Sequence, residues 1–403
     1  MRGVRRAAVL LAVSGGTAAT IVLACGPGDL SDLTRGRPDA GVDAADAADA
    51  VDAAICNHAA APPRPHVQDG PNTPQLVFVF DGVRFDNGAD DAGPPRPVGL
   101  DLDNTCTCAA PKLEPESCVP PDAGGAARPC DGMDGRDNAA GPLLAAAGAS
   151  GNGIGPGAFE KQVRGGYFNV ITTINAWNGL PDDPSVIVGL ALSGGVEGSQ
   201  SDAGHDPPKF DGTDVWTVTP SSILGGADLI GKDCRQGVGV TPCIAAKTDA
   251  MAYVSGGILV AHLDLSLPIV TADGLFTIDF AAATVTARLI PEGSHYRAVG
   301  EIDGRWPIDR LLPSIARIPN PITPGHPLCA TDSGLELYNL VKKSACENLD
   351  ITGNPALDRT GAPCDAISNA ITFTGVTATI GTVFDAPSSG DECAGFQDTC
   401  AKP

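Results

Sequence analysis

Aromatic side chains are scarce in this sequence: Phe, Tyr and Trp together make up 4% of the 403 residues, and only 3 are Trp. Glycine and proline are abundant by contrast, with 50 and 35 residues. Both residues disfavour helix interiors and are typical of the turns between short strands. The composition therefore argues against a helical bundle and favours a mostly β protein.

Positively charged residues are also in short supply. The chain has 26 Lys and Arg against 48 Asp and Glu, which gives a net charge of -22. A surface of this charge is repelled by the phosphates of nucleic acids and by anionic lipid headgroups. We therefore expect that the protein has no nucleic-acid partner.

Long apolar runs are missing even at the amino terminus. Arg2, Arg5 and Arg6 precede two short apolar stretches, 7–13 and 18–23, which the polar residues 14–17 separate. A transmembrane helix needs about 20 consecutive apolar residues, so neither stretch is long enough to span a bilayer. Positive charge followed by a short apolar region is typical of an export signal, which we assign to residues 1–24.

The four residues Val22-Leu23-Ala24-Cys25 resemble the lipobox of bacterial lipoproteins. That resemblance implies cleavage before Cys25, a lipid on its thiol and attachment to a membrane through the acyl chains. Gly26 follows in place of the Asp that retains enterobacterial lipoproteins at the inner membrane, so we expect the outer membrane. The alternative is an ordinary secretory signal with a coincidental cysteine.

Residues 25–74 are expected to form a disordered, lipid-anchored tether. Their Asp-Ala repeat contains Asp39, Asp43, Asp46 and Asp49 and no bulky apolar residue, so it cannot bury enough surface to offset chain entropy. Five prolines between 62 and 74 favour an extended chain. The folded domain is then 75–403.

The cysteines indicate disulfides. Of 13 cysteines, 12 remain once Cys25 carries lipid, and an exported protein meets an oxidising environment. Cys234 and Cys243 flank a turn-rich loop and are expected to pair, as are Cys393 and Cys400. The set 106, 108, 118 and 130 has no deducible connectivity, and Cys56 is a candidate partner for one of 329, 346 and 364. A zinc site at 106–108 is the competing interpretation, which the lack of a second Cys pair at zinc-ligand spacing disfavours.

Short apolar runs and alternation of apolar and polar residues predict a series of short strands. These lie at 76–80, 168–176, 185–192, 215–219, 251–254, 258–267, 275–280 and 283–290, and strand character returns at 371–384. Helical spacing appears after Trp306, and Asp332 or Ser333 is a candidate cap for a second helix. We predict an antiparallel β-sandwich or jelly-roll-like domain with a helical, disulfide-stapled excursion at about 306–368.

One loop has the composition of a metal site. Residues 130–138 place Asp131, Asp134 and Asp137 among glycines, and these oxygens could converge on a hard cation such as Ca²⁺. Asp101 and Asp103 point the same way on an extended chain and could complete the site. The loop partly resembles the Cys-Asp-Gly-x-Asp-Asn element of secreted bacterial metal-binding repeats, but in a single copy and with Arg136 inserted. The alternative is a polar Asp/Gly loop pinned by Cys130.

Motifs of nucleophilic or zinc catalysis are missing from the sequence. It contains no Gly-x-Ser-x-Gly, no His-Glu-x-x-His and no histidine pair at ligand spacing. His262 is expected to be an ordinary sheet residue, and the three tryptophans are expected to be buried rather than to stack on sugars.

Taken together, the lipobox, the Asp/Ala-rich tether and the cysteine-containing β-rich body resemble surface lipoproteins of high-GC bacteria such as myxobacteria, a group with no agreed activity to transfer. The resemblance implies a non-enzymatic cell-surface module, structural or binding a surface glycan or protein, and the acidic loop adds stabilisation by Ca²⁺. The alternative is a secreted polysaccharide hydrolase on a jelly-roll scaffold, with an unrecognised carboxylate pair.

Overall fold

The computed structural model of this chain describes residues 56–84, 98–108, 114–121, 129–149, 156–198, 206–235, 243–271, 274–385 and 392–400. All of them belong to the unit that runs from Asp52 to Pro403. The predicted signal peptide 1–24, Cys25 and the Asp-Ala stretch lie outside the described residues.

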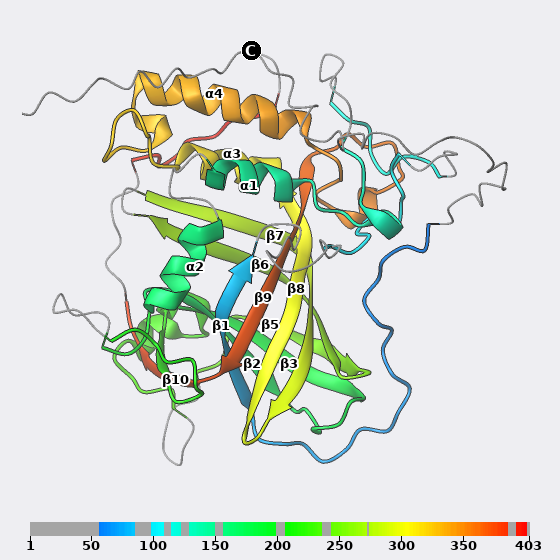
Figure 1. Ribbon diagram of the computed structural model, residues 1–403, viewed down its shortest axis with the longest axis vertical. Helices are drawn as coiled ribbons and strands as arrows, with labels where there is room; N and C mark the ends of the chain where they lie inside the picture. Colours follow the sequence, from blue (N-terminus) through cyan, green and yellow to red (C-terminus); the bar gives the residue numbers. More distant parts are fainter. Residues whose placement is uncertain are drawn as a thin grey trace, which may run out of the picture. The chain divides into compact units, whose positions relative to one another are not determined.

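Eight strands of this unit form one antiparallel sheet that closes on itself in the order β1-β2-β3-β5-β6-β7-β8-β9 (Figure 1). The strands are β1 (Leu76–Arg84), β2 (Asn169–Asn175), β3 (Asp183–Ser193), β5 (Lys247–Ser255), β6 (Ile258–Thr271), β7 (Gly274–Glu292), β8 (His295–Pro307) and β9 (Ala366–Thr377). Closure occurs where β9 pairs with β1 as well as with β8. A separate parallel pair consists of β4 (Val215–Val218) and β10 (Thr379–Val383).

The predicted class is confirmed: the domain is mostly β and antiparallel, with few helices and with disulfides near the carboxyl terminus. Hydrogen bonds join all eight strands into one closed barrel. The two packed faces that the sandwich prediction assigns to separate sheets are therefore opposite walls of one continuous sheet. Two strand predictions differ in detail. The stretches 275–280 and 283–290 are a single strand, β7, and 371–384 is divided into β9 and β10.

Both faces of the sheet are buried in the region of β1. Phe78 and Phe80 face the barrel interior and belong to the larger hydrophobic core. Val77 and Val79 face outward into a second core, which contains the wholly buried Trp216 of β4. A strand that is covered on both sides reads as a continuous apolar run, which explains the sequence of β1.

Four α-helices lie in the described part of the chain. They are α1 (Ala140–Ala149), α2 (Pro156–Gly165), α3 (Ile308–Ala316) and α4 (Asp332–Glu347), and the single-turn 3-10 helices are η2 (Met133–Gly135), η3 (Pro220–Ser222), η4 (Gly226–Leu229), η5 (Leu328–Ala330) and η6 (Pro355–Leu357). In Figure 1, α1, α3 and α4 gather at one end of the barrel. The cap of α4 is Thr331, whose hydroxyl accepts from the Gly334 N–H at 3.1 Å. None of the helices described combines the length and the apolar character needed to cross a bilayer.

Residues 56–74 are extended, as predicted, but they are not a free spacer. The Tyr253 hydroxyl donates to the Pro62 carbonyl at 2.7 Å, and the Arg64 guanidinium binds the carbonyls of Pro184 and Met251. The Thr73 N–H donates to the Trp177 carbonyl at 2.7 Å. The segment runs along the outside of the strands toward the end away from α4 (Figure 1). Residues 56–74, which we predicted to belong to the tether, therefore contact the barrel, and composition alone does not signal such contacts.

Six disulfides use all twelve cysteines beyond Cys25. They are Cys56–Cys106, Cys108–Cys130, Cys118–Cys364, Cys234–Cys243, Cys329–Cys393 and Cys346–Cys400. The predicted Cys234–Cys243 bond is confirmed. The predicted Cys393–Cys400 bond is wrong, because these two cysteines reach different helices, η5 and α4. Cys56 does not pair with any of 329, 346 and 364, and both cysteines of the alternative zinc site are oxidised.

Candidate metal centre

Two segments that are far apart in the sequence meet on the outer side of the barrel. The Asp137 N–H donates to the Leu100 carbonyl at 3.0 Å, and the Asp137 carboxylate accepts from the Leu102 N–H at 2.7 Å. The disulfide Cys108–Cys130 joins the same two segments. The backbone contacts and the disulfide thus hold the predicted loop 130–138 against the predicted pair Asp101 and Asp103.

Three carboxylates converge where the segments meet. One oxygen from each of Asp101, Asp103 and Asp137 lies within 4.8 Å of the other two. Asp103 and Asp137 are buried, with exposed fractions of 4% and 3%, and the Asp101 side chain is 1% exposed. Asp101 and Asp103 therefore come together as predicted, but residues 102–104 form a bend in place of the predicted extended segment.

Burial and mutual repulsion raise the carboxyl pKa values in this cluster. Loss of solvation, together with the neighbouring charge of Asp101, raises the pKa of Asp103 to about 6. The pKa of Asp137 is raised well above its usual range, first by burial and then by the charges of Asp103, Asp350 and Asp131. Each of these charges is another carboxylate, so the cluster is a region of strongly negative potential.

The arginines of this region bind elsewhere. Arg305 is paired with Asp358 at 2.6 Å, Arg136 donates to the Gly99 carbonyl, and Arg359 donates to the Thr105 hydroxyl at 3.3 Å. Among the described residues, Asp103 and Asp137 form no ion pair with Lys, Arg or His. A buried carboxylate without a cationic partner is costly unless it binds a proton or a metal ion.

Ser117 adds a neutral oxygen to the cluster. Its side chain is 0% exposed, and its hydroxyl has no hydrogen-bond partner of ordinary geometry among the described residues. It nevertheless lies close enough to Asp103 to lower the pKa of that carboxyl. A buried, unsatisfied hydroxyl beside a carboxylate is a suitable additional donor for a hard cation.

Asp131 and Asp134 do not join the three converging carboxylates. Asp131 accepts from the Thr107 N–H at 2.5 Å, and burial raises its pKa to about 7. Asp134 has a left-handed backbone, with φ 61°, and its carboxylate accepts from the Asn57 amide at 3.2 Å. The prediction that all three loop aspartates converge is therefore corrected: the turn at Asp134 directs its side chain to residue 57, and only Asp137 belongs to the close group.

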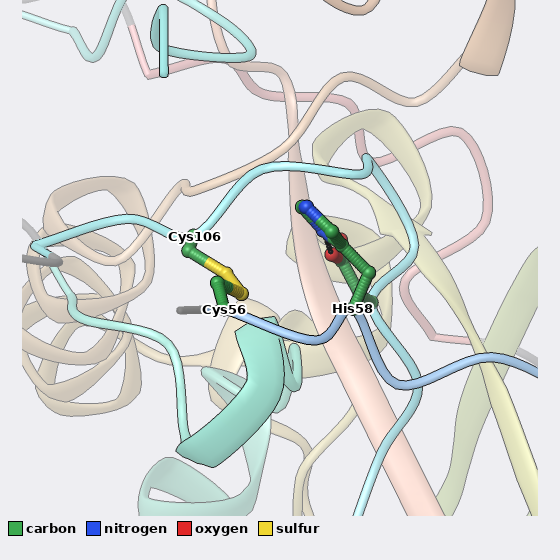
Figure 2. A group of neighbouring side chains, drawn as sticks. Cys56, His58 and Cys106 are labelled. Carbon is green, nitrogen blue, oxygen red and sulfur yellow. Dashed lines mark hydrogen bonds and ion pairs between the residues drawn. A yellow bond between two sulfur atoms is a disulfide. The ribbon is translucent and has the colours of Figure 1, made fainter. Parts of the chain in front are cut away.

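His58 lies at the edge of the cluster and was not singled out by its sequence. Its Nδ1 lies 2.5 Å from Asp101 Oδ2, and its Nε2 lies 3.0 Å from Glu114 Oε1. The hydrogen bond to Asp101 raises the pKa of the imidazole, with the charges of Asp101 and Glu114 adding to it. Figure 2 shows His58 beside the Cys56–Cys106 disulfide, whose sulfurs are bonded to each other. These sulfurs are therefore not available as thiolate ligands, although Cys56, His58, Asp101 and Cys106 lie close together.

The carboxyl-terminal part of the chain supplies one more acid that sequence reasoning missed. The Asp350 carboxylate accepts from the backbone N–H of Ser368 at 2.8 Å and from its hydroxyl at 2.5 Å. Its charge raises the pKa values of Asp131 and Asp137. The separation of more than 200 residues along the chain explains why no local pattern signalled this residue.

A second buried acidic pair lies on β8. Asp303 is 0% exposed and its pKa is raised well above the usual range, first by burial and then by the charge of Glu301. The Gly99 N–H lies 3.5 Å from Glu301 Oε2. Both acids lie under the segment that begins at residue 98, so they face backbone rather than a substrate cleft.

The tryptophans provide no platform for a sugar. Trp177, Trp216 and Trp306 are 5%, 0% and 2% exposed, in line with the predicted core positions. His262 is an exposed residue of β6 whose Nδ1 lies 3.1 Å from the Thr284 hydroxyl, as expected for an ordinary sheet position. Neither observation favours the hydrolase alternative.

Comparison of this chain with protein-family models, with curated proteins and with solved structures finds no match in any of the three. The functional argument therefore depends on the geometry of the cluster alone. Chemically, that cluster offers buried oxygen donors, mostly anionic, from three separate parts of the chain.

Proposed function

We propose that this protein is an exported, lipid-anchored surface module of non-enzymatic function, in which Asp101, Asp103 and Asp137 hold one structural Ca²⁺ ion. The observation that carries the proposal is the convergence of these carboxylates within 4.8 Å while two of them are buried and repel each other. A divalent cation would offset this repulsion by attraction to all three carboxylates.

Calcium fits the available donors better than a transition metal does. The cluster offers carboxylate oxygens and the Ser117 hydroxyl, and Ca²⁺ prefers oxygen ligands. Zinc and copper prefer imidazole nitrogen or thiolate sulfur, and the neighbouring cysteines 56 and 106 form a disulfide. Water or backbone carbonyls would complete the six to eight ligands that are typical of Ca²⁺.

The role of the ion would be to fasten two long loops onto the barrel. The described residues of the segment from residue 98 and of the loop 130–138 form no helix or named strand apart from η2, so no regular hydrogen-bond ladder holds them in place. The disulfides Cys56–Cys106 and Cys108–Cys130 fasten the same loops covalently. Disulfides are typical of exported proteins and rare in the reducing cytosol. An exported protein also meets extracellular Ca²⁺, so both features are compatible with export.

A thermal unfolding experiment tests the calcium proposal. The oxidised chain from residue 25 would be melted in EDTA and in millimolar Ca²⁺ at pH 8, with Mg²⁺ as the comparison ion. At 100 times the Kd, Ca²⁺ should stabilise the fold by about 2.7 kcal/mol and raise the Tm by several degrees. An unchanged Tm in Ca²⁺ would contradict the proposal.

Attachment through Cys25 is tested separately by Cys25→Ser in the full chain with its signal. We expect the wild-type protein to sediment with the outer membrane and the variant to become soluble, because single weak contacts do not replace several acyl chains. A variant that stays with the membrane would contradict the anchor, whatever the result with Ca²⁺. A surface glycan or protein remains the proposed class of partner.

A further inference from the structure

A mixed group of sulfur, nitrogen and oxygen donors lies beside the acidic cluster (Figure 2). Four potential ligand atoms lie within 4.8 Å of one another, and they come from Cys56, His58, Asp101 and Cys106. Among the described residues, no other disulfide belongs to a group of this kind. Two sulfurs, one imidazole nitrogen and one carboxylate oxygen match a tetrahedral zinc site in the number and the kind of donors.

His58 is oriented in the way that is usual for a metal-binding histidine. Its Nε2 lies 3.0 Å from Glu114 Oε1, and the other carboxylate oxygen of Glu114 accepts from the Cys106 N–H at 3.0 Å. A carboxylate on the far ring nitrogen fixes the tautomer and the orientation of a histidine ligand. This contact leaves Nδ1, which lies 2.5 Å from Asp101 Oδ2, as the nitrogen that can bind an ion.

The disulfide that joins the two sulfurs is accessible to a reductant. Cys56 and Cys106 are both half-buried, and the His58 side chain is 32% exposed. The Cα atoms of the two cysteines lie 6.4 Å apart, the widest separation among the six disulfides. Two thiolates on one Zn²⁺, each about 2.3 Å from the metal, lie farther apart than two bonded sulfurs. Zinc binding therefore needs no closer approach of the two segments.

We propose that reduction of the Cys56–Cys106 disulfide converts this group into a site for one Zn²⁺ ion. Two thiol groups of a reductant supply the electrons: they become a disulfide while the protein disulfide becomes two thiols. Zn²⁺ then displaces both thiol protons as it binds. The ion joins residues 56–58 to the loop 101–106, as the disulfide does in the oxidised chain, so the two segments stay linked in both redox states.

The zinc site and the calcium site can be tested apart. Calcium is proposed for the oxidised chain and for carboxylate oxygens, whereas the zinc site exists only in the reduced chain and needs the two sulfurs and the imidazole of His58. Asp101 is common to both groups. The zinc experiment is therefore done without Ca²⁺, so that either proposal can fail while the other holds.

The thiol–disulfide equilibrium of each cysteine pair tests the inference. In the Cys25→Ser chain every remaining cysteine belongs to one of the six disulfides. This chain would be equilibrated in glutathione redox buffers with Zn²⁺ or with EDTA. An acid quench releases the zinc, and the free thiols are then alkylated and quantified for each peptide by mass spectrometry.

Zn²⁺ should favour reduction of this one pair. Above its Kd for the reduced chain, each tenfold rise in free Zn²⁺ should shift the Cys56–Cys106 equilibrium about tenfold toward the thiols. The neighbouring Cys108–Cys130 pair is the internal control, because it belongs to no such group, and its equilibrium should not move. No shift of Cys56–Cys106 at millimolar Zn²⁺, or an equal shift of both pairs, would overturn the proposal.

Two histidines of the same segment give matched variants. His58 belongs to the donor group, whereas His66 is exposed and does not. Loss of even an outer partner of a ligand typically costs 10–100-fold in metal affinity, so His58→Gln should weaken zinc binding at least about tenfold. His66→Gln should leave it unchanged. Equal zinc-dependent shifts in the two variants would place the ion on other donors and overturn the proposal.

Cobalt gives a measurement that needs no substitution at the site, in case His58→Gln fails to fold. Thiolates bound to Co²⁺ produce a sulfur-to-metal charge-transfer band, which a site made only of oxygen donors does not give. The band should appear at the redox poise where only Cys56 and Cys106 are reduced, be missing from the oxidised chain, and disappear when Zn²⁺ is added. A reduced chain that shows no such band would contradict a thiolate site.

Discussion

Gly135 lies so close to Asp101 that a Cβ atom on residue 135 would come within 2.7 Å of Asp101 Oδ2. Gly135 also has a positive φ of 72°, a conformation that side chains rarely adopt. The glycine therefore lets the loop approach the carboxylate cluster, which gives the residue a specific role beyond the turn itself.

Gly135→Ala should weaken Ca²⁺ binding and destabilise the fold by about 1–2 kcal/mol, because the methyl group displaces Asp101 and the backbone is strained. The matched control is Gly132→Ala, since φ there is -71° and the nearest atoms to an added Cβ lie at 3.5 Å. Urea unfolding with and without Ca²⁺ measures both effects. Equal behaviour of the two variants would show that residue 135 does not limit the approach to Asp101.

The stability of the metal-free protein should fall as the pH rises from 5 to 8. The pKa values of Asp103 and Asp131 are raised to about 6 and about 7, so the folded chain binds protons that the unfolded chain has already lost. This stabilisation is complete below about pH 4 and disappears as the pH passes the folded-state values.

We expect a loss of roughly 3 kcal/mol over this range in EDTA, measured as the free energy of unfolding in urea. Saturating Ca²⁺ should reduce the loss, because the ion favours the ionised carboxylates, and its stabilising effect should therefore be larger at pH 8 than at pH 5. An effect of Ca²⁺ that is greater at pH 5 would contradict the assignment of these groups as ligands.

Arg305 binds the backbone between Asp101 and Asp103 of the cluster. It is 1% exposed, pairs with Asp358 through two guanidinium nitrogens at 2.8 and 2.6 Å, and donates to the Leu102 carbonyl at 2.6 Å. Arg305→Lys keeps the charge but cannot form this fork, and should cost about 3 kcal/mol of stability. The comparison is Arg297→Lys, at the partly exposed pair with Asp81, which should cost less than about 1 kcal/mol. Similar losses at the two sites would show that the buried network adds little.

The disulfide Cys118–Cys364 joins residues 246 positions apart, whereas Cys234–Cys243 closes a separation of 9. Loop-closure entropy predicts that the double Ser variant of the first pair loses about 5 kcal/mol and that of the second about 3 kcal/mol. The other disulfides shorten the long loop, so the difference is an upper bound. Chemical unfolding of the two oxidised double variants measures it, and a larger loss for the short loop would contradict the expectation.

Local patterns predicted much of the fold. Alternation of apolar and polar residues identified the strand at 168–176, and apolar runs identified those at 76–80 and 185–192, because each strand buries the residues of one or both faces. It failed for β8, where Arg297, Glu301, Asp303 and Arg305 interrupt the apolar character. Among them, Arg297 pairs with Asp81 of β1 and Arg305 with the Leu102 carbonyl, partners far away in the sequence that no nearby pattern signals.

Only part of the acidic centre could be predicted from the sequence, because local patterns do not show which distant residues come together in the fold. Asp101, Asp103 and Asp137 stood out by composition and spacing, whereas Asp350 and His58 enter the cluster only through tertiary contacts. The orientation of Asp134 depends on a left-handed backbone at a non-glycine residue, which the sequence does not reveal. Disulfide pairing failed similarly wherever the partners came from different parts of the fold.

The most direct measurement is an equilibrium titration of the oxidised chain with Ca²⁺ at pH 8, for the wild type, Asp137→Asn and Asp134→Asn. We predict one ion per chain in the wild type, a similar affinity in Asp134→Asn, and an affinity at least about 100-fold lower in Asp137→Asn, because a buried anionic ligand is lost. No saturable binding by the wild type, or equal binding by Asp137→Asn, would contradict a calcium centre at Asp101, Asp103 and Asp137.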